Sequence, residues 1–376
     1  MRDFLRLRPV SYGMKTILIA GAVMFGIIVL AIVVLPFIFG VTFSAPSTAG
    51  KADTQGVFLS EDGGATWQAR NNIKDSKLKL SGLNITDFAI DSKNSGWLFM
   101  ATSNSGIWKS DDGGQNWEKV VDKAGTLDPK AQVLRLVISK KNSNLWFTAV
   151  YQKNRGAVLK SEDGGETFKE VYFVPVERFG VFNLAYDDAA GIVTIVNGQG
   201  GLLESRDLGK SWRVVKWFTD GLTGIVADPV ASSIYYILTA KGKIFKTADR
   251  GASFTDLSSN FSSFDKSWKN QNLTIDPLSG TLYLGSDYGI IRSKNGGFSW
   301  ESVPVIIPPE ALPVLSIAVN SNDSRAFFVT AQSQIYRTAD GGVNWSIVPS
   351  PISGRRITKF VIDKNDANRI YLIGNK

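Results

Sequence analysis

Seven short segments of this chain repeat a pattern of side chains that could carry acid chemistry. Each follows the pattern [Ser/Thr]-x-[Asp/Asn]-x-Gly-x-[Ser/Thr/Asn]-[Trp/Phe]. The segments are 60–67, 110–117, 161–168, 205–212, 247–254, 293–300 and 338–345. Their acidic or amide residues are Asp62, Asp112, Asp163, Asp207, Asp249, Asn295 and Asp340. A carboxylate held beside a hydroxyl group is able to act as a general acid or base.

We interpret these seven residues as structural rather than catalytic. An aspartate can accept hydrogen bonds from the backbone of its own turn, and glycine adopts the positive φ that tight turns require. The closing tryptophan or phenylalanine can pack over the turn and against a neighbouring unit. Since a catalytic residue is needed once rather than seven times, the pattern predicts seven hairpin turns, each held by its own aspartate or asparagine.

Other side-chain chemistry is restricted by composition. The chain has no cysteine and no histidine among its 376 residues. Disulfides, thiol nucleophiles, histidine-based triads and His/Cys metal sites are therefore excluded. No glycine-rich phosphate loop precedes a predicted helix. The sequence predicts no catalytic residue, no cofactor and no metal site.

The elements that position these turns repeat with the same period. The first residues of successive segments lie 42 to 51 positions apart, which is typical of repeat architectures with one supersecondary unit per repeat. The clearest unit predicts four short strands, A to D, from alternation and from β-branched or aromatic content. They cover residues 85–91, 96–101, 106–110 and 116–120.

The number of hairpins predicts the architecture. Seven C–D hairpins contain the repeated turns, and seven A–B hairpins lie between them. The first C–D hairpin, 56–69, has no A–B hairpin before it, and the last A–B hairpin, 357–375, has no C–D hairpin after it. Joining the two ends in one blade removes unpaired strand edges. The sequence predicts an all-β, seven-bladed β-propeller of four-stranded antiparallel blades, closed by the C-terminal strands pairing with the N-terminal hairpin.

The octapeptide resembles the Asp-box, or BNR repeat, of sialidases, sortilin-type receptors and propellers of the photosystem II stability/assembly factor type. The whole region from residue 56 onward resembles the last group, with seven boxed blades and no catalytic insert. The resemblance implies that the box lies on the outer rim, away from the ligand site. It also implies that the channel-mouth face grips another protein, often during assembly of a membrane complex, but it names no particular partner.

Strand A should line the central channel, and its register predicts which side chains face it. The third position is mainly polar and the fifth is mainly small, whereas large apolar residues lie between them and pack between blades. The third-position residues are Asp87, Arg135, Asn183, Gly224, Asn272, Ser316 and Lys359.

The D–A and B–C connections share the face opposite the repeated turns, and long loops often carry binding residues. At the channel mouth we expect Asp87, Arg135, Asn183 and Lys359 to bind. On the loops we expect Arg155, Arg178, Trp268, Tyr288, Arg355 and Arg356. Arginine together with aromatic residues is a usual composition for a protein-binding surface. Charge reversal at Arg135 and Lys359 should then weaken capture of a partner and leave stability almost unchanged.

The N-terminus predicts a membrane anchor. Residues 17–39 are uncharged and strongly apolar, and as a helix they would span roughly 35 Å, enough for a bilayer core of ~30 Å. Basic residues precede them, which places that end in the cytoplasm. A cleaved signal peptide is the alternative. The predicted organisation is a cytoplasmic basic segment (1–15), a transmembrane anchor (16–40), a linker (41–55) and an extracytoplasmic propeller (56–376).

Two classes of function remain open at this stage. The first is a non-catalytic, membrane-anchored scaffold that binds a protein, such as a membrane complex. The alternative is a cell-surface glycan-binding protein or glycoside hydrolase of the sialidase or glucanase type. Hydrolysis needs two carboxyl groups, and the predicted mouth offers only Asp87. Exposed Trp217 and Trp268 would favour sugar stacking, although we expect Trp217 to pack beneath its own loop. A net charge of +8 with mixed signs does not indicate nucleic acid.

Overall fold

The computed structural model describes residues 55–80, 82–307 and 313–375. The chain divides into two units, Met1–Ala52 and Asp53–Lys376, and only the second is described here. The predicted cytoplasmic segment and anchor, with the linker up to residue 54, lie outside the described residues. Within the described ranges, no helix is long and apolar enough to cross a bilayer.

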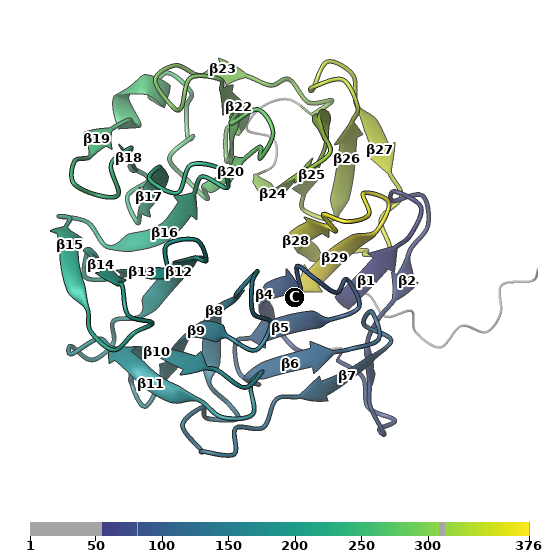
Figure 1. Cartoon of the computed structure of the whole chain (residues 1–376). Helices are drawn as coiled ribbons and strands as arrows, with labels where there is room; N and C mark the ends of the chain where they lie inside the picture. The colour runs from purple at the N-terminus through teal and green to yellow at the C-terminus, as the bar shows by residue number, and fades with distance from the viewer. Residues whose placement is uncertain (1–54, 81, 308–312, 376) are drawn as a thin grey trace, which may run out of the picture. The chain divides into compact units, whose positions relative to one another are not determined.

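The described unit is a ring of seven antiparallel blades around a central channel, which confirms the predicted all-β, seven-bladed propeller (Figure 1). Each blade has its A strand innermost and its D strand outermost. The inner strands are β4 (Ile85–Ile90), β8 (Gln132–Ile138), β12 (Val181–Asp187), β16 (Leu222–Ala227), β20 (Asn272–Ile275), β24 (Val314–Asn320) and β28 (Arg356–Ile362).

The remaining strands complete the blades in chain order. Blade 1 adds β5 (Leu98–Thr102), β6 (Ile107–Ser110) and β7 (Asn116–Lys119), with β3 (Asn72–Ile73) parallel to β7. Blade 2 adds β9 (Trp146–Gln152), β10 (Arg155–Ser161) and β11 (Lys169–Phe173); blade 3 adds β13 (Ile192–Asn197), β14 (Gly201–Ser205) and β15 (Arg213–Trp217). Blade 4 adds β17 (Tyr235–Thr239), β18 (Ile244–Thr247) and β19 (Thr255–Asp256); blade 5 adds β21 (Leu282–Ser286), β22 (Gly289–Ser293) and β23 (Glu301–Ser302). Blade 6 adds β25 (Asp323–Ala331), β26 (Gln334–Thr338) and β27 (Ser346–Val348).

Blade 7 joins the two ends of the described unit. Its order is β2-β1-β29-β28, where β1 (Gly56–Ser60) and β2 (Gln68–Ala69) come from the N-terminal side and β29 (Ile370–Asn375) from the C-terminal side. Five residues of β1 pair with β29, from Gly56 opposite Gly374 to Ser60 opposite Ile370. The predicted closure of the ring is therefore confirmed.

Backbone hydrogen bonds divide the loops into two faces. The repeated turns bond to A–B hairpins, as in Gly113 N to Gly96 O and Gly164 N to Asn144 O. The B–C hairpins bond to D–A connections, as in Gly156 N to Phe179 O and Asp287 N to Lys269 O. We call these the turn face and the mouth face, respectively. The structure confirms that they are opposite, because successive strands of each blade are antiparallel.

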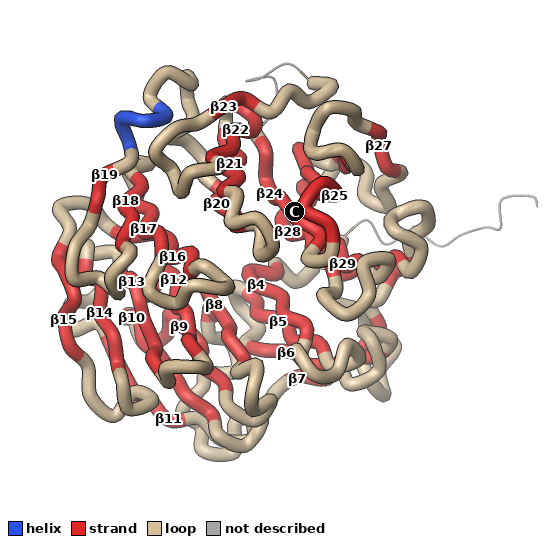
Figure 2. The backbone as a smooth tube through the Cα atoms, turned by 45° about the horizontal axis from the view of Figure 1, so that its top comes forward, coloured by secondary structure: helices blue, strands red, loops and turns tan. Residues whose placement is uncertain are grey.

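The apolar core is distributed between blades rather than gathered in one place. Each cluster of buried side chains combines two neighbours, such as Tyr283 of blade 5 with Phe327 of blade 6, whose ring centroids lie 4.9 Å apart. This arrangement follows from the sequence, since both faces of each sheet meet another sheet and need apolar residues. Figure 2 shows the strands radiating from the channel and one 3₁₀ helix, Ser258–Phe261, after β19. The sequence indicated no helix in this region.

A bulge near the start of strand A was not predicted. In six blades the A–B register shifts across the residue just before the third position of strand A, as between Ile85 and Asp87 or between Val181 and Asn183. The same shift occurs in the other four at Val133/Arg135, Leu222/Gly224, Val314/Ser316 and Ile357/Lys359. A bulged residue leaves the ladder and is re-aimed, here at the mouth face.

Candidate binding site on the mouth face

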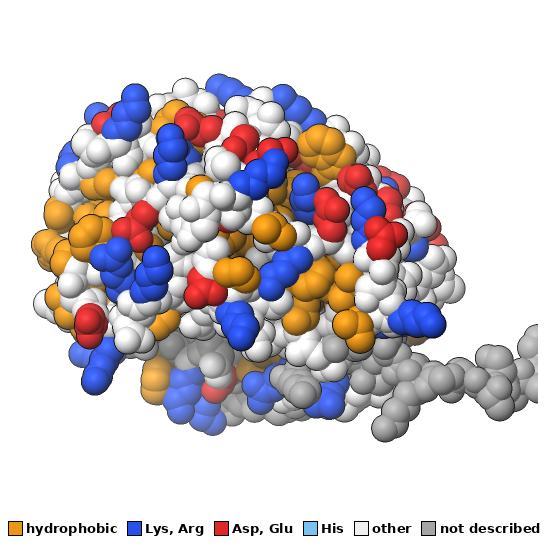
Figure 3. Space-filling model, turned by 90° about the horizontal axis from the view of Figure 1, so that it is seen from below, with side chains coloured by type: hydrophobic (Ala, Val, Ile, Leu, Met, Phe, Trp, Pro, Cys, Tyr) orange, Lys and Arg blue, Asp and Glu red, His pale blue; other side chains and the backbone are white. Residues whose placement is uncertain are grey.

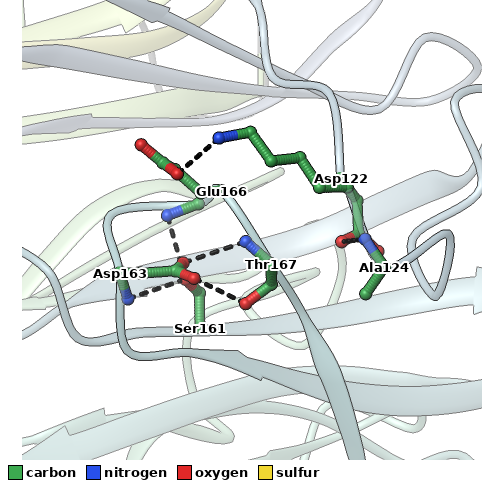
Figure 4. A network of polar contacts seen from close by, with 8 residues as sticks. Asp122, Ala124, Ser161, Asp163, Glu166 and Thr167 are labelled. Atoms are coloured by element: carbon green, nitrogen blue, oxygen red, sulfur yellow. Dashed lines mark hydrogen bonds and ion pairs between the residues drawn. The ribbon is translucent and has the colours of Figure 1, made fainter.

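The repeated turns are closed networks of hydrogen bonds on the turn face. In the third copy, Ser161 Oγ donates to Asp163 Oδ1 at 2.7 Å and accepts from Gly165 N at 2.9 Å (Figure 4). Thr167 donates to both carboxylate oxygens, through its backbone N–H to Oδ1 and its hydroxyl to Oδ2. The sixth copy keeps this geometry with an amide, since Ser299 N donates to Asn295 Oδ1 at 2.9 Å. The carboxylate oxygens are therefore occupied by hydrogen bonds within their own turns.

These bonds also lower the pKa of the turn aspartates. Bonds from the residue four positions on, Thr167 in the third copy, hold the pKa of Asp163 at about 2. The same cause holds the pKa of four other turn aspartates at about 2, namely Asp62, Asp207, Asp249 and Asp340. A carboxylate with such a pKa is ionised at neutral pH and is a poor proton donor or acceptor there.

The channel forms a cavity of about 730 Å³. Its lining includes third-position residues Arg135, Asn183 and Lys359 and fifth-position residues Ala185 and Thr274, in agreement with the predicted register. Bulged second-position threonines also line it, namely Thr86, Thr223 and Thr358. Sequence reasoning missed these, although three polar residues at the second position of an inner strand were a visible signal.

Asp87 does not line the channel cavity as a free acid. Its side chain is only 3% exposed, and it pairs with Arg135 (Nη1 to Oδ1, 3.3 Å) and with Lys359. Leu136 N also donates to its Oδ2 at 3.0 Å. Burial opposes the charged form, but Arg135 and Lys359 outweigh it, so the pKa of Asp87 lies below its ordinary value. Asp87 acts as a buried counter-ion that holds two basic side chains at the mouth.

The ion pairs of Asp87 change the result that we expect from charge reversal at the channel mouth. Charge reversal at Arg135 and Lys359 would place two carboxylates beside buried Asp87 instead of two cations. Removing the partners of a buried charge is strongly destabilising. This double substitution is therefore not a neutral test of binding.

The loop residues expected to bind lie on the mouth face in three separate groups. Arg155 and Arg178 lie on adjoining connections at blades 2 and 3, where Arg178 N donates to Asn154 O, next to Arg155, at 3.1 Å. Trp268 and Tyr288 lie on adjoining loops of blades 4 and 5; Trp268 is 53% exposed, whereas Tyr288 packs against Phe264. Arg355 and Arg356, beside blade 7, are exposed. Sequence spacing did not reveal that these residues form separate groups at blades 2 and 3, at blades 4 and 5, and at blade 7.

An aromatic patch adjoins the first group and was not predicted. It consists of Phe173, Phe179, Phe182 and Trp217, which are between 38% and 54% exposed. The hairpin from Asn197 to Gly201 runs between them, and a side chain at Gly198 would lie 2.7 Å from the ring of Phe182. Phe182 is exposed because it is the bulged residue of β12.

Basic side chains border the aromatic patch. The guanidinium of Arg155 lies 4.2 Å from the ring centroid of Phe173 and pairs with Glu170 at 2.8 Å.

Trp217, which we expected beneath its own loop, is 54% exposed, so that expectation was wrong. Strand β15 ends at Trp217, and the ring stacks beside Gly201 at the rim of the hairpin rather than under it.

Charge over the rest of the surface is mixed. On the side of the ring shown in Figure 3, basic and acidic side chains are interspersed with apolar ones. Around the ring, basic and acidic side chains also pair across adjacent strands, such as Lys109 with Glu118 at 3.2 Å and Arg292 with Glu301 at 2.6 Å. This side presents no continuous basic field of the kind that binds a nucleic-acid backbone.

Comparisons with known proteins agree with this architecture. The photosystem II assembly lipoprotein Ycf48 of Synechococcus sp. (strain CC9902) is 23% identical over 249 residues, which are 65% of this chain and 68% of that protein. The structure of YCF48 from Cyanidioschyzon merolae aligns with a TM-score of 0.61 at 13% identity, over 77% of this chain and 95% of that one. No family model matches the chain.

Glycoside hydrolases share the fold as well. The GH74 xyloglucanase from Xanthomonas campestris aligns with a TM-score of 0.64 at 16% identity over 78% of this chain. The aligned region spans about half of that enzyme, 51% of its length. Identity this low shows the fold alone. The chain is a seven-bladed β-propeller that resembles propellers of the Ycf48 and GH74 types.

Proposed function

We propose that this protein is a non-catalytic scaffold that binds a protein partner through its mouth face, as part of the assembly of a membrane complex. The observation that carries the proposal is the aromatic patch beside Arg155 and Arg178. Four large rings there are 38% to 54% exposed, whereas half of the aromatic residues in the described ranges are buried. Aromatic residues and arginine are the types enriched in protein interfaces.

The similarity to Ycf48 supports this function, because Ycf48 is an assembly factor by name and one structure is of YCF48 bound to D1 peptide. We further propose the predicted topology: a basic cytoplasmic segment (1–15), a single anchor (16–40), a linker (41–55) and an extracytoplasmic propeller (56–376). The ten predicted binding residues are kept in this proposal with changed roles. Asp87 positions Arg135 and Lys359, whereas Arg155 and Arg178 border the contact surface.

The alternative is a glycan-binding protein or glycoside hydrolase, which the GH74 fold keeps open. A pair of carboxyl groups would be needed for hydrolysis. Among the described residues that line the channel cavity there is no carboxylate. A hydrolytic site would therefore have to lie elsewhere on the ring, and the channel favours the binding function.

The test is site-specific photo-cross-linking in native membranes. A photoreactive phenylalanine would replace Phe182 on the mouth face in the full-length chain, and a matched chain would carry it at Val343, which is 75% exposed on the turn face. We expect one membrane protein to be cross-linked from position 182 and not from position 343. The same adduct from both positions, or an adduct from 343 alone, would contradict the proposed face. Absence of any adduct together with retention on a glycan array would favour the alternative.

A further inference from the structure

A second cavity opens on the turn face between blade 3 and blade 4, which adjoin in Figure 1. Its volume is about 400 Å³, within the range of small-molecule pockets. Its walls come from the A–B hairpins of blades 2, 3 and 4, from β13 and β14, and from β16 and β17. None of the predicted binding residues lines it.

The cavity lies where blade 3 departs from the other blades. In six blades, the B-strand residue paired with the fifth position of strand A is aromatic and at most 5% exposed. These residues are Phe99, Phe147, Tyr236, Tyr283, Phe328 and Tyr371. In blade 3 the corresponding residue is Thr194, and it lines the cavity. An aromatic ring that fills the space between blades elsewhere is therefore missing here.

Strand C of blade 3 also differs from strand C of the other blades. The C-strand partner of that aromatic residue is basic in five blades, where it is Lys109, Lys160, Lys246, Arg292 or Arg337. The partner of Thr194 is Glu204, which is only 4% exposed. Arg206 and Arg213 both donate to its Oε1, at 2.6 and 2.7 Å. Blade 3 has thus exchanged an aromatic–basic pair for a hydroxyl–acid pair at the cavity wall.

Tyr235 supplies a buried polar group without a partner. It lines the cavity and is 7% exposed, and its hydroxyl has no hydrogen-bond partner among the described residues. Buried hydroxyl groups are normally satisfied, so an unpaired one on a residue that lines a cavity indicates a ligand group. Burial raises the pKa of Tyr235, so the hydroxyl is protonated at neutral pH and able to donate.

The turn that borders the cavity is also altered. Where a tyrosine fills the space between blades, its hydroxyl lies near a glycine of a repeated turn. The hydroxyl of Tyr236, for example, donates to Gly296 O at 3.3 Å. The corresponding position beside this cavity is Arg250, a non-glycine residue with φ of +58°. Its Nη2 donates to Ser232 Oγ at 2.9 Å, which holds the exposed guanidinium at the cavity rim.

The rim carries charges of both signs, from Asp187, Asp188 and Asp228 and from Lys140, Lys141 and Arg250. Asp187 and Asp228 accept backbone N–H groups of their own hairpins, and Asp188 accepts the backbone N–H of Lys140 at 3.0 Å. Within the described part of the chain, the ammonium groups of Lys140 and Lys141 form no ion pair. An anionic group on a ligand would find these cations at the opening.

We propose that the cavity binds a small phenolic carboxylate. Its ring takes the place of the aromatic side chain that blade 3 lacks. Its hydroxyl accepts from Tyr235 and donates to Glu204, while its carboxylate lies toward Lys140, Lys141 and Arg250. The site is on the face opposite the proposed protein-binding surface, so the test of this ligand site does not depend on the proposed function.

The test is equilibrium binding of 4-hydroxyphenylacetate to the purified full-length chain by ligand-observed NMR, with phenylacetate as the matched probe that lacks the hydroxyl. We expect a dissociation constant between about 10 µM and 1 mM, as for a well-placed ligand of this size. Phenylacetate should bind about fivefold more weakly, since it lacks the hydrogen-bonding group. Equal affinity for the two probes, or no binding at 5 mM (about five times the weakest constant expected), would overturn the proposal.

Two substitutions localise the binding. Thr194→Phe supplies the ring that six other blades have, so the variant should fold, gain about 1–4 °C in Tm and lose binding. Tyr235→Phe removes only an unpaired hydroxyl, so it should preserve Tm and reduce the preference for the phenol over phenylacetate, because the contact with Glu204 remains. Binding that persists in Thr194→Phe, or a lower Tm for that variant, would place the ligand elsewhere and contradict the proposed site.

Discussion

The aromatic residues that close the repeated turns connect one blade to the next. Four of them donate an indole N–H to a carbonyl of the preceding blade or of the segment that leads from it, as Trp117 Nε1 does to Arg70 O at 2.8 Å and Trp212 Nε1 to Val171 O at 2.7 Å. The other two are Trp67 to Pro349 O and Trp345 to Pro304 O. A single residue type thus provides both the apolar contact and the polar contact between blades.

Trp117 is the most deeply buried tryptophan of this group. It is fully buried, and its ring lies 6.2 Å from that of Phe88. Trp117→Ala should lower the free energy of unfolding by about 3–5 kcal/mol, because it leaves a cavity and an unpaired carbonyl. Denaturant titration measures this loss. The control is Trp217→Ala, which changes an exposed ring and should cost less than about 0.5 kcal/mol. Equal losses in the two variants would contradict the role of Trp117.

The role of Asp87 differs from the two roles that its position in the sequence suggested. A carboxylate near a channel mouth suggested a ligand contact or an acid. In the structure its oxygens are occupied by Arg135, Lys359 and the backbone of Leu136. Asp87 therefore holds the two cations in place at the channel mouth.

At the scale of the element, the octapeptide turn is a self-contained unit. The first hydroxyl and the third residue bond to each other and to the backbone of the turn, and Asn295 Oδ1 accepts from Ser293 Oγ and Ser299 N as an aspartate does. Its Nδ2 donates to Ser299 Oγ at 2.8 Å, the reverse of the bond that an aspartate accepts at this position. Since an amide serves equally well, the geometry depends on the acceptor oxygen and not on the negative charge.

The charge nevertheless makes the turns sensitive to acid. The pKa of Asp163 is about 2 in the folded protein, below the ordinary value of 3.8, so ionisation stabilises the folded state above about pH 4. This stabilisation is lost as the pH falls toward 2. Asp163→Asn should retain the turn and reduce the fall in Tm between pH 5 and pH 2.5, measured by calorimetry. The control is Asp265→Asn, at a 70% exposed aspartate. An unchanged fall in Tm for Asp163→Asn would contradict this account.

The bulge near the start of strand A is the element that shapes the mouth face. It turns Thr86, Thr223 and Thr358 into the channel and leaves Phe182 exposed. Without the bulge, strict alternation would put the second position with the apolar residues between blades. A single-residue irregularity therefore decides which side chains the channel and the mouth face present.

For the whole molecule, the decisive contact is the pairing of β1 with β29. Asn375 strengthens it by bonding to blade 1, where its Oδ1 accepts from Ile85 N at 3.0 Å and its Nδ2 donates to Ile85 O at 2.7 Å. The last residues of the described chain thus tie blade 7 to blade 1. A ring closed in this way has no open sheet edge at its junction.

Deletion of residues 357–376 should prevent stable folding, because it removes β28 and β29 and exposes β1. Circular dichroism on heating should show no cooperative transition for the truncated chain. Removal of Lys376 alone is the control and should leave Tm unchanged. A truncated chain that melts cooperatively at the temperature of the full chain would show that the ring does not depend on this closure.

The sequence by itself determined the architecture and the chemistry of the repeats. Period, strand pattern and unmatched terminal hairpins are local or countable features, and they predicted seven blades, the shared closing blade, the structural turns and the channel register. These predictions succeed because alternation and turn chemistry act over a few residues.

Only the tertiary structure decided which side chains meet. The aromatic patch joins residues of β11, β12, β15 and a loop, the Asp87 pairs join blades 1, 2 and 7, and the cavity at Thr194 appears only when each blade is compared in register with its neighbours. Such features depend on contacts between segments far apart in the chain and on bulges that shift the alternation by one residue. Burial and proximity arise from the packing of whole sheets, which no local pattern encodes.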